Sequence, residues 1–286
     1  ESAGFRLAAN LPTKHYARKN IAYLQAIRSG AGCIYETDDD NAPNTVWGLR
    51  EEQVNGVRII GASAPRWVNV YRYFSRENIW PRGLPLDEIR RTCPEVQTSE
   101  GAVRAPIQQG LVDGSPDVDA IWRLVMDREF YFDEGGTVYL EPGNWCPFNT
   151  QSTWWWSVAY PLLYIPSYCS FRMCDIWKSF IAQRCLWAMN LGVAFHRAEV
   201  IQERNHHDLI RDFTDEIPGY EENRRIAEIL DSLELSDGGD EVAVNLRVCY
   251  VALVKAGVFP EKELQLVDAW LEDLKNAAKT ANGSIS

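Results

Sequence analysis

The chain has 286 residues, of which 46% are hydrophobic and 12% aromatic, and its formal net charge is −11 at pH 7. This composition predicts a folded protein with a substantial core rather than a disordered chain. The acidic charge argues against non-specific binding to nucleic acid or to an anionic membrane. The most apolar run is interrupted by Pro161 and Pro166, so no membrane-spanning helix is expected.

The first part of the chain predicts helices alternating with strands. Residues 18–32 have apolar residues at helical spacing and end in glycines. Residues 33–37 (CIYET) are β-prone, and three aspartates follow them directly. Further elements are expected as strands at 57–63 and 67–74, a rigid Pro/Gly loop at 79–85 and a short helix at 86–92. Helix, strand and acidic loop in this order indicate an α/β fold.

The second part continues this alternation and then changes in composition. Residues 105–126 predict a strand, a turn-rich loop and a helix, with Asp117 or Asp119 near the helix start. The elements expected next are a loop into an apolar segment at 148–166, a helix at 170–190 and a strand at 192–204. From about residue 207 the chain is rich in Glu, Asp, Leu and Ala, which predicts a helical tail broken near 236–240.

The seven cysteines show no CxxC pair and no Cys/His spacing typical of structural zinc. Their odd number rules out complete internal pairing, and one or two disulfides remain open. The sequence also lacks the GxSxG, P-loop, HExxH and GxGxxG motifs. At motif level this argues against the common hydrolases, nucleoside triphosphatases, zinc peptidases and dinucleotide-binding enzymes.

The stretch DDDN after the strand has two interpretations. On an extended backbone Asp38 and Asp40 point to the same side, with Asp39 turned away and Asn41 shaping the turn. Two such carboxylates suit a hard cation such as Mg²⁺ or Mn²⁺. The alternative is a hydrated loop at the end of a strand.

Two basic stretches are candidate anion binders. Arg18 and Lys19 are suited to a diphosphate, and Asn20 to the edge of a base or sugar. The alternative for them is the basic first turn of a surface helix. Arg82 lies in the rigid loop and would be preorganised for an anion, although a purely structural loop is the simpler interpretation.

Further polar residues follow later in the chain. Asp175, near a helix start, is a helix cap or a general base, and the sequence does not decide between them. Arg184 lies two turns further along this helix and is within reach of the same pocket. Gln109 is suited to hydrogen bonding with a sugar. Of the adjacent His206 and His207, at most one would join a given metal site, and a partly exposed pair is the alternative.

Six stretches occur in an order that resembles a known family: RKN-x-x-Y, DDDN, WPRGLPL, IQQG with PDVD, FNTQST, and CDI-x(5)-AQR-x-LW. This order is similar to that of the DUF288 family, which includes the plant STELLO glycosyltransferases associated with cellulose synthesis. The resemblance spans about residues 11–215. It rests on the order of the stretches, because no single one is decisive.

The resemblance implies a GT-A-like fold, with a mixed sheet flanked by helices at 1–215 and a packed helical C-terminal extension at 216–286. In such domains the first nucleotide-binding strand lies well upstream of the acids, so here it is missing or built differently. The implied activity is metal-dependent transfer of a sugar from a nucleotide-sugar, a UDP-sugar above all, to a hydroxyl acceptor such as a carbohydrate. The cation would be Mn²⁺ or Mg²⁺.

The resemblance also implies roles for particular residues. Asp38, Asp40 and His207 would hold the metal, and Asp175 would be the base of an inverting enzyme. The donor-binding set would be Arg18, Lys19, Asn20, Asp38, Arg82, Gln109 and Arg184.

Two other functions stay open. One is a non-catalytic GT-A-like protein that binds partners in a polysaccharide synthesis complex, and the other is a metal-dependent nucleotidyltransferase. The plant members are Golgi membrane proteins. The expected location is therefore the Golgi lumen for a eukaryotic fragment and the cytoplasm otherwise, and the oligomeric state is open.

Overall fold

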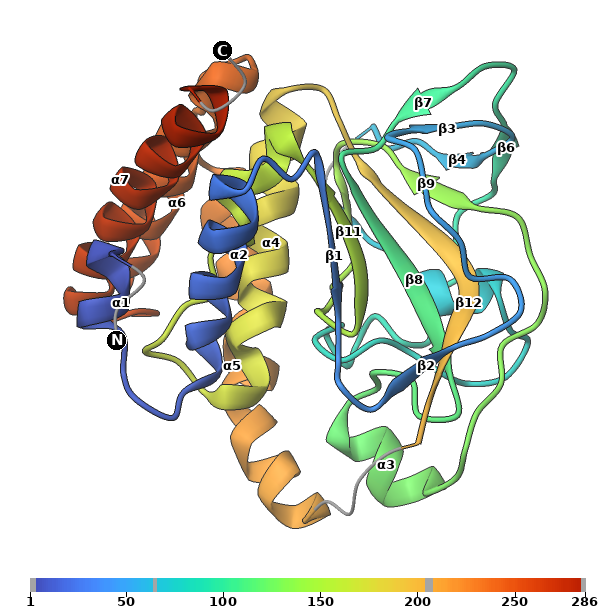
Figure 1. Ribbon diagram of the computed structural model, residues 1–286. Helices are drawn as coiled ribbons and strands as arrows, with labels where there is room; N and C mark the ends of the chain where they lie inside the picture. The colour runs from blue at the N-terminus through green and yellow to red at the C-terminus, as the bar shows by residue number, and fades with distance from the viewer. Residues whose placement is uncertain (1–3, 64–65, 204–207, 284–286) are drawn as a thin grey trace.

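A computed structural model describes residues 4–63, 66–203 and 208–283. Helices α1, α2 and α4 to α7 form a layer on one side of a β-sheet, and the short helix α3 lies near the end of β12 and packs against α5 (Figure 1). The helices are α1 (Arg6–Asn10), α2 (Lys19–Arg28), α3 (Ala120–Met126), α4 (Cys174–Ala188), α5 (Leu209–Asp231), α6 (Val242–Lys255) and α7 (Lys262–Gly283). The short 3₁₀ segments are η1 (Tyr16–Arg18), η2 (Val70–Tyr73), η3 (Ser157–Leu163), η4 (Phe171–Met173) and η5 (Gly239–Glu241).

In the described part of the chain the main sheet has eight strands in the order β1-β11-β8-β12-β9-β4-β6, with β2 also paired to β12. The β8–β12 and β4–β9 pairs are parallel, and the other pairs in this sheet are antiparallel. The strands are β1 (Cys33–Thr37), β2 (Asn41–Pro43), β4 (Arg58–Ile60), β6 (Gln97–Thr98), β8 (Ile107–Asp113), β9 (Val138–Leu140), β11 (Ser152–Trp156) and β12 (Val193–Gln202). Two small sheets pair β3 (Gln53–Val54) with β7 (Val103–Arg104) and β5 (Arg66–Trp67) with β10 (Asn144–Trp145). This mixed sheet with flanking helices confirms the predicted fold class.

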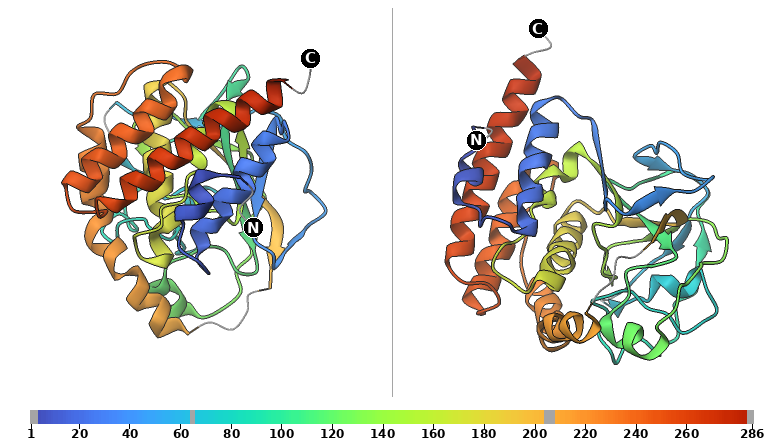
Figure 2. Two further views of the ribbon diagram at one scale, coloured as in Figure 1. Left: turned by 60° about the vertical axis from the view of Figure 1, so that its left-hand side comes forward. Right: turned by 60° about the horizontal axis from the view of Figure 1, so that its bottom comes forward.

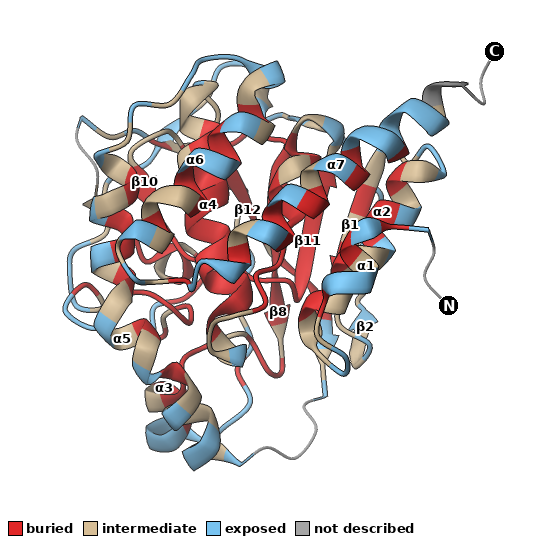
Figure 3. Cartoon of the chain, turned by 90° about the vertical axis from the view of Figure 1, so that its left-hand side faces the viewer, coloured by how far each residue is buried: buried red, intermediate tan, exposed pale blue. Residues whose placement is uncertain are grey.

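A large hydrophobic cluster includes residues of both the sheet and the helix layer. Figure 3 shows buried residues on α4 and on β8, β11 and β12. β11 places Trp155 on this inner side, with none of its surface exposed, and Trp154 is also buried. The tryptophans 154 and 155 are therefore held in the interior, where stacking on a free sugar is not available to them.

Two local predictions are wrong, and a third segment is a strand that the sequence did not specify. Residues 67–74 form only the end of β5 and then the turn η2, whose Val70 and Tyr71 are buried in the core. Residues 86–92 form turns, not a helix. Residues 152–156, where a loop was expected to lead into an apolar segment, are a strand, because β11 finds partners on both sides in β1 and β8. In residues 67–74 and 152–156 tertiary contacts decide the local structure.

The C-terminal helices are tied to the rest of the chain by buried polar contacts. Glu263, at the start of α7, accepts hydrogen bonds from Tyr164 Oη at 2.6 Å and from the Tyr168 backbone N–H at 2.9 Å. Trp270 Nε1 donates to the Pro161 carbonyl at 2.9 Å. Helices α1 and α2 lie along α7 (Figure 2). Among the described residues, no helix has the length and hydropathy needed to cross a membrane.

The contact between β9 and the start of β12 depends on a glycine. A Cβ at Gly192 would lie 1.8 Å from the Leu140 carbonyl oxygen. We expect Gly192→Ala to lower the free energy of unfolding by about 2 kcal/mol, because backbone must shift to relieve the clash. Urea denaturation would measure this change.

The matched control is Gly32→Ala, since no atom lies within 4 Å of the added Cβ there. It should change the free energy of unfolding by less than about 0.5 kcal/mol. Equal stability of the two variants would contradict the close approach of β9 and β12.

Candidate functional site

A cavity of about 310 Å³ opens where several strand ends meet the start of α4. The segments that follow β1 and β8 contribute to it, as do the segment before β11 and the end of β12. These four strand ends lie at the same edge of the sheet. Such a volume is in the range of small-molecule sites, roughly 300–1,000 Å³.

The floor of the cavity is a buried guanidinium between two carboxylates. Arg82 donates to Asp117 through Nε and Nη2, both at 2.8 Å, and to Asp175 through Nη1 at 3.0 Å and Nη2 at 2.8 Å. Its remaining Nη1 hydrogen is donated to the Arg172 carbonyl. An arginine has five N–H donors, and all five are used here. The expected direct contact of Arg82 with an anion is therefore not available without breaking this cluster.

Charge pairing keeps Arg82 and Asp117 ionised despite their burial. Burial by itself lowers the pKa of Arg82, but Asp117 and Asp175 together raise it well above its ordinary value. Burial likewise raises the pKa of Asp117, and the adjacent Arg82 brings it below the usual range. Each charge is thus stable only because its partner is present.

Asp175 is placed differently from a helix cap. The N-cap residue of α4 is Met173, and Asp175 lies within the first turn. Its Oδ1 accepts from Arg82 and from the Ile176 backbone N–H at 3.1 Å, whereas its Oδ2 accepts, among the residues that the structure describes, from Arg82 alone. One lone pair of Oδ2 therefore stays available to a ligand. The cap near the end of β8 is Asp119, which accepts from the Trp122 backbone N–H at 2.8 Å.

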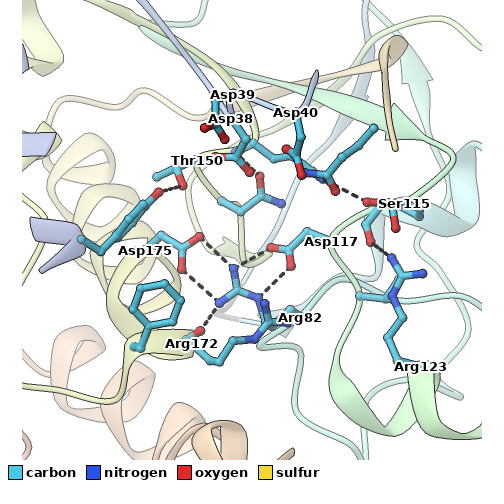
Figure 4. A pocket seen from close by; sticks show the side chains of 17 residues that line it. Asp38, Asp39, Asp40, Arg82, Ser115, Asp117, Arg123, Thr150, Arg172 and Asp175 are labelled. Carbon is cyan, nitrogen blue, oxygen red and sulfur yellow. Dashed lines mark hydrogen bonds and ion pairs between the residues drawn. The ribbon is translucent and has the colours of Figure 1, made fainter. Parts of the chain in front are cut away.

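The three acids after β1 occupy the turn that leads into β2. The Asn41 backbone N–H donates to the Asp38 carbonyl at 3.3 Å, and Asp38, Asp39 and Asp40 all line the cavity (Figure 4). The extended backbone on which Asp39 was expected to turn away is not formed here, because Asp39 and Asp40 lie in a turn. Asp40 Oδ1 accepts from Gln202 Nε2 at 2.8 Å.

Asp38 lies in a crowded electrostatic environment. Burial raises its pKa to about 7, against the opposing effect of Lys19, and the nearby carboxylates of Asp175, Asp117 and Glu36 add to the rise. The Lys19 ammonium lies 3.9 Å from Asp38 Oδ1 and 3.5 Å from Oε1 of the buried Glu36. The acidic turn is thus only partly neutralised by protein cations.

The chemistry of this turn fits a hard cation. Its donors are carboxylate oxygens, and the buried Asn41 Oδ1 has no hydrogen-bond partner within the described part of the chain. Among the described residues, no group of three His, Cys, Asp or Glu side chains converges tightly enough to hold a metal alone. The remaining ligands would have to be substrate or water oxygens. His206 and His207 lie outside the described residues.

The other candidate donor-binding residues do not line the cavity. Asn20 is buried and bonds both the N–H and the carbonyl of Ile165. Gln109 is also buried and donates to the Gly110 and Ser152 carbonyls. The side chains of Asn20 and Gln109 therefore make hydrogen bonds to backbone groups of the fold.

The same holds for Arg184, which donates to the carbonyls of Leu230 and Leu233 and so ties α4 to the end of α5. Arg18 lies in η1 and is partly exposed, outside the cavity lining. Of the basic candidates at 18–20, only Lys19 is brought next to an acid of the cavity.

Several lining residues were not identified from the sequence. They include Tyr16, whose hydroxyl bonds Thr150, and Phe171 and Arg172 directly before α4. Burial first, and then the charges of Asp175, Glu36 and Asp38, raise the pKa of Tyr16 well above its ordinary value. The sequence offered one indication of their role, which is their position next to candidate site stretches: Tyr16 precedes the RKN stretch and Phe171 precedes the CDI stretch.

Replacing Arg82 tests the cluster. Arg82→Met would leave Asp117 and Asp175 buried without a counter-charge, so we expect the free energy of unfolding to fall by about 3–5 kcal/mol. The control Arg247→Met removes an exposed pair with Asp268 and should cost about 0–1 kcal/mol. Urea denaturation compares the two, and similar losses would contradict the role given to Arg82.

Comparison with known proteins identifies relatives. The profile of the family described as STELLO glycosyltransferases matches residues 172–281. "Probable glycosyltransferase STELLO1" of Arabidopsis thaliana is 27% identical over 310 aligned positions, which cover 95% of this chain and 37% of that protein. "Probable glycosyltransferase STELLO2" of the same plant is 26% identical over 300 positions, with 94% and 37% covered. The chain therefore spans little more than a third of the length of these relatives. The resemblance inferred from the six stretches is confirmed, and the chain is STELLO-like, related to a family of glycosyltransferases.

Proposed function

We propose that this chain carries a glycosyltransferase site, which moves a sugar from a UDP-sugar to a hydroxyl of an acceptor with Mn²⁺ or Mg²⁺ as cofactor. The observation that carries the proposal is the meeting of the acidic turn and Asp175 in one cavity. The similarity to two proteins named as probable glycosyltransferases supports it.

The acidic turn is the proposed place for the donor diphosphate. Asp38 and Asp40 would hold the cation, which when bound supplies positive charge beside the leaving diphosphate. Lys19 holds Asp38 from the side of the helix layer. Gln202 fixes Asp40 from the end of β12. Both acids are therefore positioned by contacts that do not involve the ligand.

Asp175 is the proposed base. The acceptor hydroxyl would give its proton to Asp175 Oδ2 as its oxygen bonds the anomeric carbon, and the bond from that carbon to the diphosphate would break. The free lone pair of Oδ2 supports this assignment. Arg82 acts through Asp175 as a positioning residue, because it fixes both oxygens of the carboxylate.

The first test removes a carboxylate from the turn. With UDP-sugar and Mn²⁺, Asp40→Asn should lower the rate of donor hydrolysis or transfer by about a hundredfold, since stabilisation of the leaving group is lost. A chelator added to the unmodified protein should have a comparable effect. The control is Asp240→Asn, an exposed acid in η5, which should leave the rate unchanged.

Two outcomes favour the other functions. A protein that binds UDP-sugar but never turns it over, with water or any acceptor, would support the interaction protein. Reaction with nucleoside triphosphates alone would support the nucleotidyltransferase.

The second test separates catalysis by Asp175 from its ion pair. Asp175→Asn should lower transfer by about a hundredfold or more, because the proton acceptor is lost, while UDP affinity measured by calorimetry stays within about twofold. Asp117→Asn is the matched control, since it removes the other carboxylate of Arg82. If both variants lose transfer and stability to the same extent, Asp175 is a structural partner and not the base.

A further inference from the structure

The mouth of the cavity carries an exposed aromatic ring. Phe171, in η4, is 58% exposed and lines the cavity. It is the one side chain, among the large exposed hydrophobics of the described residues, that does so. Single exposed hydrophobic residues are normal on a protein surface. At the edge of a small-molecule cavity, however, such a ring offers an apolar face to a ligand.

A second ring supports Phe171. The ring of Tyr16 meets it edge to face, with centroids 5.7 Å apart and planes at 70°. The Tyr16 hydroxyl is bonded to Thr150, and the Lys19 ammonium lies 5.4 Å from the centroid of the Tyr16 ring. Tyr16 is therefore held by polar contacts and keeps its ring as a fixed backing for Phe171.

The backbone that carries Phe171 is fixed on both sides. Ser170 Oγ donates to the Asp215 carbonyl in α5. Arg172 donates to the buried Glu216 through Nε at 2.9 Å and Nη2 at 2.8 Å. The ring is thus preorganised, and a ligand that stacks on it would not have to order the segment.

The ring belongs to the wall that carries the proposed base. Phe171 precedes Asp175 by one turn of chain, and Arg82 bonds both the Arg172 carbonyl and Asp175. Figure 4 shows Arg172 and Asp175 beside Arg82, with the acidic turn on the other side. A group stacked on Phe171 would therefore lie beside Asp175.

We propose that Tyr16 and Phe171 form an acceptor subsite, which binds the C–H face of a pyranose ring so that one of its hydroxyls reaches Asp175. The acceptor would then be a carbohydrate. This inference rests on the proposed glycosyltransferase function, because it takes Asp175 as the group that meets the acceptor.

The test measures binding of methyl glucopyranoside, galactopyranoside and mannopyranoside to the full chain by saturation-transfer NMR, with sorbitol as an acyclic reference. The unmodified protein should bind at least one pyranoside and not sorbitol. Phe171→Ala should weaken pyranoside binding about tenfold, as expected for the loss of one ring stack. Phe171→Trp should restore it. UDP affinity in the presence of Mn²⁺ should change by less than about twofold in both variants.

The matched control is Tyr131→Ala, since Tyr131 is also 58% exposed but lies outside the cavity lining. It should leave pyranoside binding unchanged. The proposal is overturned if no pyranoside binds, or if Phe171→Ala has no more effect than Tyr131→Ala. It is also overturned if Phe171→Ala weakens UDP binding instead, because that result would indicate that the ring binds the nucleoside base of the donor. Failure of the proposed function is seen separately, as absent UDP-sugar binding by the unmodified protein, because the pyranoside titration needs no donor.

Discussion

The arrangement of the cavity depends on the buried guanidinium of Arg82. Asp117 follows β8 in the sheet layer and Asp175 lies at the start of α4 in the helix layer, so Arg82 connects the two layers at the cavity floor. Neither carboxylate could be buried there without a partner except at a cost of several kcal/mol. The shape of the site is therefore fixed by charge pairing between distant segments, and the glycine and prolines around Arg82 hold the loop in a compatible conformation.

A second buried ion pair joins the helix layer to the sheet one turn further along α4. Lys178 lies three residues after Asp175, on the same face of the helix, and its ammonium is 3.2 Å from Oε2 of Glu36 in β1. Tyr23 and Trp155 also donate to Glu36. Burial lowers the pKa of Lys178, and Glu36 opposes that effect. Because Glu36 is two residues before Asp38, this pair anchors the strand that ends in the acidic turn.

The sequence predicts the parts of the site that depend on local patterns. The helix at 170–190, the strand at 33–37 and the acids directly after it follow from periodicity and turn residues. It could not predict that Asn20 is hydrogen-bonded to the Ile165 backbone, or that Arg184 is hydrogen-bonded to the Leu230 carbonyl, because these contacts join residues far apart in the chain. Phe171 was missed because nothing in its neighbours distinguishes an exposed ring from a core ring.

The charges around the cavity connect the proposed donor to a cation. The lining includes five carboxylic acids and three guanidinium groups, so the acids outnumber the cations even when Asp38, whose pKa is raised to about 7, is protonated: Asp38, Asp39, Asp40, Asp117 and Asp175 against Arg82, Arg123 and Arg172. Arg82 has no donor left, and Arg172 is paired with the buried Glu216. A diphosphate that entered alone would meet repulsion from the acidic turn. A divalent cation bound with it would reverse the sign of that interaction. The excess of carboxylates in the cavity, more than any single acid, is therefore the physical reason to propose a divalent cation together with the nucleoside diphosphate donor.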